Sequence, residues 1–146
     1  MDAKALYQAA VLDHAKHPRR EGPLADATHE ATLSNPLCGD RVTVRARVAQ
    51  GVVEDVRFEA RGCMIARASA SMMAEALAGR AVGDALSLED ALQQLATAAE
   101  EPAGDAGPLE PLRGVRAFPA RVGCVTLAWS CLRQALTADL PGGSHV

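Results

Sequence analysis

The 146-residue sequence predicts a single α+β domain in which helices pack on a small antiparallel sheet of three strands. The first observation is the order of the patterns: helical spacing near the amino terminus, strand alternation in the middle, and helical spacing again afterwards. The second is the length, which fits one domain and suffices to bury roughly two-thirds of the unfolded surface. The third is the composition, because 49% hydrophobic and 23% charged residues are typical of a globular protein. We therefore expect one domain over residues 1–146.

The first helix is expected over Ala3–Lys16, where apolar side chains recur at helical spacing and Pro18 follows as a helix breaker. His14 lies on the apolar stripe. We interpret it as a half-buried histidine with a hydrogen-bond partner rather than as a metal ligand. The sequence contains no histidine-based zinc motif of the HExxH type.

Two strands are expected in the middle of the chain, over about residues 42–48 and 56–60. Apolar residues alternate there with charged or polar ones, which is typical of strands with one buried face. Gln50-Gly51 supplies the turn between them, so the two strands form an antiparallel hairpin. A short edge strand is expected near residues 30–34.

Two further helices are expected after the hairpin. The first covers about residues 65–77, and Gly79 stands where a carboxy-terminal cap belongs. The second covers about residues 87–98, because Ser87-Leu88-Glu89-Asp90 resembles a capping box with a shorter acid.

The carboxy-terminal part of the sequence combines a loop, a helix and a tail. Near residues 99–114, acidic residues, proline and glycine without periodicity predict a loop. The clearest helix is expected over about residues 121–138, and its apolar stripe includes Cys124 and Cys131. Residues 139–146 are expected to form a flexible tail.

The composition excludes several classes of function. The formal net charge is −3 and the isoelectric point is about 5.8, so we expect no nucleic-acid partner, which would need a basic patch. Aromatic residues make up only 3%, which leaves no stacking platform for single strands. The sequence has neither an apolar run of about 18 residues nor a signal peptide at its start, so we expect a cytoplasmic protein without a membrane partner.

Four cysteines are candidates for chemistry, because cytoplasmic thiols serve more often as metal ligands, nucleophiles or core residues than in disulfides. Cys38 stands in a glycine-containing turn directly before a strand, and Asp40 follows two residues later. Cys63 lies at a strand-to-helix junction, where backbone N–H groups stabilise a thiolate. Cys124 stands near the start of the last helix. This placement indicates a site assembled by the fold. On spacing alone, inert core cysteines remain the alternative, since no CxxC pair is present.

The fourth cysteine, Cys131, follows Cys124 by seven residues on the same expected helix. The two side chains then lie about 10 Å apart along the helix axis. One tetrahedral zinc ion, with bonds of about 2.3 Å to sulfur, cannot bind both. We therefore expect Cys131 to be a core residue.

Ordered motifs span nearly the whole chain, from about residue 6 to residue 136. They are Leu12-Asp13-His14 with Pro18-Arg19, Asn35-Pro36-Leu37-Cys38-Gly39-Asp40, Val53-Glu54-Asp55-Val56-Arg57-Phe58, Gly62-Cys63, Ala68-Ser69-Ala70-Ser71-Met72-Met73, and Phe118-Pro119-Ala120-Arg121 before Cys124. In this order they resemble the IscU/NifU-type iron–sulfur cluster assembly proteins, and within them the SufU-type branch. The resemblance implies a SufE/NifU-like fold and a function in iron–sulfur cluster biogenesis.

The resemblance also implies a metal site formed by Cys38, Asp40, Cys63 and Cys124. The scaffold branch has a histidine directly before its last cysteine, whereas this sequence has Gly123 there. An extra segment between the second and third site cysteines is typical of the SufU-type branch. Both features favour a zinc-dependent sulfurtransferase that accepts persulfide sulfur from a SufS-type cysteine desulfurase. Other iron–sulfur assembly proteins are further candidate partners. Three thiolates and one carboxylate suit tetrahedral zinc.

By the same resemblance, Cys38 is the catalytic sulfur acceptor and Cys124 is the second candidate. Arg121, about one helical turn before Cys124, is a second catalytic candidate that stabilises thiolate or persulfide charge, and a solvated or salt-bridged arginine is the alternative. We expect a sulfur-transfer partner of the desulfurase rather than a stand-alone enzyme. Two other functions remain open: a scaffold that assembles and transfers a [2Fe–2S] cluster on the same residues, and a structural-zinc protein that only docks other proteins.

Overall fold

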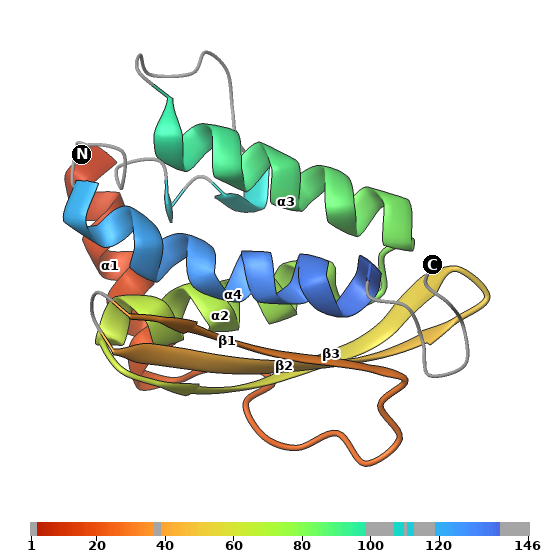
Figure 1. Cartoon of the computed structure of the whole chain (residues 1–146). Helices are drawn as coiled ribbons and strands as arrows, with labels where there is room; N and C mark the ends of the chain where they lie inside the picture. Colours follow the sequence, from red (N-terminus) through yellow and green to blue (C-terminus); the bar gives the residue numbers. More distant parts are fainter. Residues whose placement is uncertain (1–2, 37–38, 99–106, 110, 113–118, 138–146) are drawn as a thin grey trace.

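The computed structural model describes residues 3–36, 39–98, 107–109, 111–112 and 119–137 (Figure 1). Within them the chain forms one domain of four α-helices and three strands. In chain order these elements are α1 (Ala3–Lys16), β1 (His29–Asn35), β2 (Asp40–Ala49), β3 (Val52–Arg61), α2 (Met64–Leu77), α3 (Val82–Thr97) and α4 (Pro119–Thr137). The predicted α+β fold with a three-stranded antiparallel sheet is confirmed. None of the described helices is long and apolar enough to cross a bilayer.

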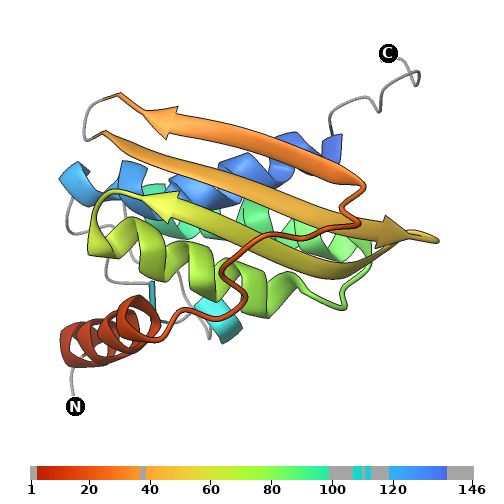
Figure 2. The same ribbon diagram turned by 90° about the horizontal axis from the view of Figure 1, so that it is seen from below.

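The sheet has the order β1-β2-β3, and both strand pairs are antiparallel. Strand alternation places Val42, Val44 and Phe58 on a fully buried face, while charged side chains occupy the other. Gln50 and Gly51 form the turn between β2 and β3 and have φ values of 54° and 78°. Positive φ at both turn residues is what the tight type I′ class of hairpin turn requires. Figure 2 looks onto the face of the sheet that no helix covers.

The helices form layers on the other face of the sheet (Figure 1). Helix α2 packs against β3, and α4 packs against β1 and β2. Helix α1 packs on α2, and α3 packs on α4 on the side away from the sheet. The starts of α2 and α4 therefore meet the same end of the sheet.

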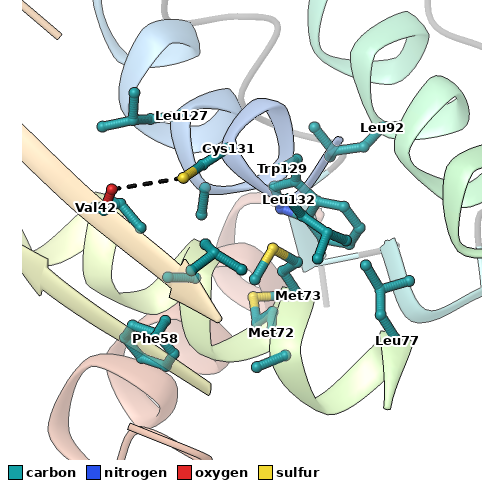
Figure 3. Packing of buried hydrophobic residues seen from close by; sticks show 14 of the residues in the cluster. Val42, Phe58, Met72, Met73, Leu77, Leu92, Leu127, Trp129, Cys131 and Leu132 are labelled. Carbon is teal, nitrogen blue, oxygen red and sulfur yellow. Dashed lines mark hydrogen bonds between the residues drawn. The ribbon is translucent and has the colours of Figure 1, made fainter. Parts of the chain in front are cut away.

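The core between the sheet and the helices is built around Trp129, Phe58 and Met73, which are fully buried (Figure 3). Trp129 Nε1 donates a hydrogen bond to Ser69 Oγ at 3.0 Å. The Ser69 hydroxyl in turn donates to the Val125 carbonyl oxygen at 2.6 Å. These buried polar atoms of α2 and α4 therefore have the partners that burial demands.

Cys131 belongs to this core, as predicted. It is fully buried, and its thiol donates to the Ala31 carbonyl oxygen at 3.2 Å and lies 3.5 Å from that of Val42 (Figure 3). Burial raises the pKa of the Cys131 thiol to about 11. The thiol is therefore protonated at neutral pH and serves packing.

Helix α1 has the predicted bounds, and His14 has the predicted half-buried environment. Its Nδ1 lies 2.8 Å from Ser71 Oγ of α2. The backbone N–H of Arg19 donates to the same oxygen at 2.8 Å. Burial, followed by the nearby Arg19 charge, lowers the pKa of His14, which favours a neutral imidazole near pH 7. His14 therefore joins α1 to α2.

The predicted start of the helix at residues 87–98 is wrong, because α3 begins at Val82 and its N-cap residue makes no side-chain hydrogen bond. Ser87 lies inside the helix. The buried stripe of α3 includes Glu89, which is only 2% exposed and accepts a hydrogen bond from Arg133 of α4. Apolar periodicity does not reveal a buried charged residue. A backbone hydrogen bond of 2.8 Å from the Val82 N–H to the β2–β3 turn also fixes the helix start.

Most of the predicted loop at residues 99–114, and all of the predicted tail at residues 139–146, lie outside the described residues. Within the loop, Leu109 and Leu112 lie in short 3₁₀ turns and are buried in the core. This part of the loop therefore packs on the domain.

Candidate metal centre

One end of the sheet holds three of the predicted ligands. Asp40 is the first residue of β2, Cys63 lies between β3 and α2, and Cys124 lies in the second turn of α4. One carboxylate oxygen and the two Sγ atoms all lie within 4.8 Å of one another. Ligand atoms around a tetrahedral zinc ion lie about 4 Å apart, because Zn–S bonds are about 2.3 Å and Zn–O bonds about 2.0–2.2 Å long. The donor set and its spacing therefore fit a zinc ion.

Asp40 is fully buried, and its carboxylate is held in place by the Cys63 region. Asp40 Oδ1 accepts a hydrogen bond of 2.9 Å from the Cys63 backbone N–H, and the Cys63 thiol donates to Oδ2 at 3.6 Å. The preceding turn is closed by a hydrogen bond of 2.8 Å from the Gly39 N–H to the Asn35 carbonyl oxygen. Gly39 has a φ of +76°, which favours glycine. The β1–β2 turn thereby places the carboxylate beside the start of α2.

Cys63 is the N-cap residue of α2. Its Sγ accepts a hydrogen bond of 3.4 Å from the Ala66 backbone N–H. This hydrogen bond holds the sulfur atom at the start of the helix. Cys63 is half-buried, whereas Asp40 is fully buried, so the site is accessible from the Cys63 side.

Gly62 makes room for the Asp40 carboxylate. Its φ is +129°, and a Cβ atom at this position would lie 2.0 Å from Asp40 Oδ1 and 2.8 Å from Asp40 Cα. No side chain fits there unless Asp40 moves. The Gly62-Cys63 pair is one of the motifs that carry the family resemblance. The reason why position 62 needs a glycine follows only from the close approach of Asp40.

Cys124 is 2% exposed, and Gly123 precedes it directly. A Cβ atom at Gly123 would lie 2.7 Å from the side-chain Nδ2 of Asn35, the last residue of β1. The Asn35 side chain thus occupies the space that a larger residue at position 123 would need. A side chain at position 123 would therefore require the end of the Asn35 side chain to move.

The other two predicted site residues are Cys38 and Arg121. Cys38 lies outside the described residues, so its role stays a prediction. Arg121 is exposed in the first turn of α4 and forms no ion pair with another described residue. Its proposed action on persulfide charge also stays a prediction, as does metal binding by Asp40, Cys63 and Cys124.

Comparison with known proteins finds relatives along nearly the whole chain. The family model for the NifU-like N terminal domain matches residues 6–138. The zinc-dependent sulfurtransferase SufU of Bacillus subtilis is 38% identical to this chain, over 94% of this chain and 93% of its own length. The iron–sulfur cluster assembly scaffold protein IscU of Streptococcus pyogenes is 39% identical, over 90% of this chain and 82% of its own length.

Solved structures show the same fold. The protein FiSufU of Fervidobacterium islandicum AW-1 superposes with a TM-score of 0.83 at 28% identity, over 93% of this chain and 100% of that one. The amino-terminal part of a nitrogen-fixing NifU-like protein of Brucella abortus gives a TM-score of 0.80 at 27% identity, over 90% of this chain and 92% of that one. The motifs, the fold and the matched length agree: the chain belongs to the NifU-like N-terminal domain family, with the SufU and IscU proteins of iron–sulfur cluster assembly as relatives.

Proposed function

We propose that this protein is a zinc-dependent sulfurtransferase of iron–sulfur cluster biogenesis, which works in the cytoplasm and accepts persulfide sulfur from a SufS-type cysteine desulfurase. The observation that carries the proposal is the approach of the Asp40 carboxylate to the thiols of Cys63 and Cys124. With Cys38, which the resemblance adds, the set has three sulfur atoms and one oxygen atom and suits tetrahedral zinc. The similarity to SufU of Bacillus subtilis supports this function.

The donor set also indicates how transfer is controlled. Bound zinc would keep the thiols deprotonated and would supply no redox chemistry. A metal-bound thiolate is a masked nucleophile, so transfer requires the release of one ligand. Because Cys63 is half-buried while Asp40 and Cys124 are buried, a partner protein reaches the site from the Cys63 side.

We assign the role of first sulfur acceptor to Cys38. Its thiolate attacks the outer sulfur of the desulfurase persulfide, a new S–S bond forms on Cys38, and the desulfurase cysteine leaves as a thiolate. This exchange needs no added oxidant or reductant. Cys124 is the second candidate, and its burial makes it harder for a persulfide to reach. Arg121, exposed at the start of α4, is proposed to balance the persulfide charge.

A scaffold for a [2Fe–2S] cluster is the second candidate function, and the similarity to IscU of Streptococcus pyogenes favours it. The same donors bind iron. Gly123 is evidence against a scaffold, because the scaffold branch has a histidine at this position. A structural-zinc protein that only docks others is the third candidate. It would need a more closed site than one with a half-buried Cys63.

Replacement of Asp40 by alanine separates transfer from scaffold function. A transfer protein should hold zinc about tenfold less tightly, or worse, and should stimulate sulfide release by the desulfurase less. By the resemblance, a scaffold should instead hold its cluster more tightly. We measure cysteine-dependent sulfide release with a SufS-type desulfurase, and visible absorbance after anaerobic reconstitution with iron and sulfide. We expect weaker sulfide release and no stable cluster.

The matched control is Asp84→Ala, which removes an exposed carboxylate in the first turn of α3. This variant should match the wild type in zinc content and in sulfide release. A strongly coloured, long-lived cluster in Asp40→Ala, with unchanged stimulation of the desulfurase, would exclude the transfer function and support the scaffold.

A further inference from the structure

Figure 2 shows the face of the sheet that no helix covers. Arginines on this face pair with acids. Arg45 donates to Glu30 at 2.6 Å and to Glu59 at 3.1 Å. Arg47 donates to Glu54 at 3.1 Å. Pairs of opposite charge across neighbouring strands stabilise a sheet. Both of these arginines therefore have acidic partners.

Arg41 and Arg61 depart from this pattern. They are direct partners in the register of β2 and β3, and both are exposed. Within the described part of the chain, neither makes an ion pair or a side-chain hydrogen bond. Like charges directly opposite each other destabilise a sheet. The stability of the sheet therefore does not explain why two arginines lie opposite each other here.

The two arginines line an open hollow of about 630 Å³ on the same face. Its lining also includes Glu21 and Glu59, but each of these acids faces another cation. Glu59 bonds to Arg45 at 3.1 Å, and Glu21 lies 3.9 Å from Arg67. Both acids therefore have a cationic partner outside the hollow, whereas Arg41 and Arg61 have no ion partner among the described residues.

The two arginines lie beside the candidate metal centre. Arg41 directly follows Asp40, and Arg61 precedes Cys63 by two residues. Met64, the next residue after Cys63, is 48% exposed and is one of three large apolar side chains that are strongly exposed among the described residues. Arginine and methionine are enriched at protein interfaces. The end of the sheet that holds the centre thus offers both charge and apolar contact.

We propose that Arg41 and Arg61 form a docking surface for an acidic segment of the cysteine desulfurase that delivers sulfur to the metal centre. The inference rests on the proposed function, because that function names the partner. Carboxylates of the partner would pair with Arg41 and Arg61, through the paired hydrogen bonds that guanidinium groups form with carboxylates. Since both arginines are fixed by the strand register, they also orient the partner toward Cys63.

The test is the double variant Arg41→Gln/Arg61→Gln. Its affinity for a SufS-type cysteine desulfurase is measured by titration calorimetry at several salt concentrations, together with zinc content and melting temperature. We expect affinity to fall by at least about tenfold and to depend less on salt. Zinc content should match the wild type. Removal of two opposed like charges should not destabilise the sheet, so the variant is expected to fold.

The matched control is Arg47→Gln, which lies on the same face but forms ion pairs with Asp26 and Glu54. Its affinity for the desulfurase should stay within about twofold of the wild type. Unchanged affinity in the double variant, an equal loss in Arg47→Gln, or loss of zinc from the double variant overturns the docking inference alone. If the wild-type protein does not bind the desulfurase, the proposed function and the docking inference both fail.

Discussion

Replacement of Gly62 by alanine is expected to abolish zinc retention and to lower the free energy of unfolding by about 3 kcal/mol. The backbone φ of +129° is strained for any residue with a side chain, and the new Cβ would lie 2.0 Å from Asp40 Oδ1. Relief requires movement of the buried Asp40, because its Cα would lie only 2.8 Å from the same Cβ. Zinc analysis of the purified variant and urea unfolding measure the two effects.

Gly79→Ala is the control for backbone strain alone. Gly79 has a φ of +91°, and a Cβ atom there would meet nothing within 4 Å. It follows the carboxy-terminal end of α2, whereas Gly62 precedes the helix start. We expect a loss of about 1–2 kcal/mol and unchanged zinc content. Zinc retention by Gly62→Ala at the wild-type level would contradict the account of this contact.

The two cysteines of α4 are expected to respond to serine substitution in opposite ways. Cys124→Ser should lose most of its zinc, because a serine hydroxyl is a poor replacement for a thiolate ligand. Cys131→Ser should keep its zinc and lose about 1–2 kcal/mol of unfolding free energy, since the residue is fully buried in the core. Zinc content and denaturant unfolding of both variants provide the comparison.

A thiol-labelling experiment checks the same contrast in the wild-type protein. Burial raises the pKa of Cys131 to about 11, so this thiol should resist alkylation at pH 8 in the folded protein, with or without zinc. Loss of zinc from Cys131→Ser, or its retention in Cys124→Ser, would contradict the assignment of Cys124 to the centre and Cys131 to the core.

The sequence predicted those elements whose burial follows apolar periodicity. The β2–β3 hairpin is of this kind, because apolar residues form most of its buried positions, which also include Asp40 and Asp55. Helix α3 is not, since its stripe buries Glu89 against Arg133 of a distant helix. That pairing depends on how α3 and α4 pack, and no local pattern contains it.

The candidate site was predictable in part for a related reason. Asp40, Cys63 and Cys124 stand at the ends of elements, and element ends can be located from turns and periodicity. The role of Gly62 depends on the distance between two strands, and the opposition of Arg41 and Arg61 depends on strand register. A shift of one residue in that register would place other side chains opposite each other. The sequence specifies these contacts only through the complete fold.

The proposed function requires that this chain holds zinc on three sulfur atoms and one oxygen atom. The most direct measurement is metal analysis combined with X-ray absorption spectroscopy on protein purified from cells supplied with both iron and zinc. The account predicts colourless protein with about one zinc per chain and a first shell of three sulfur ligands near 2.3 Å and one oxygen ligand near 2.0–2.2 Å. Brown protein that contains iron and sulfide in equal amounts, without zinc, would contradict it.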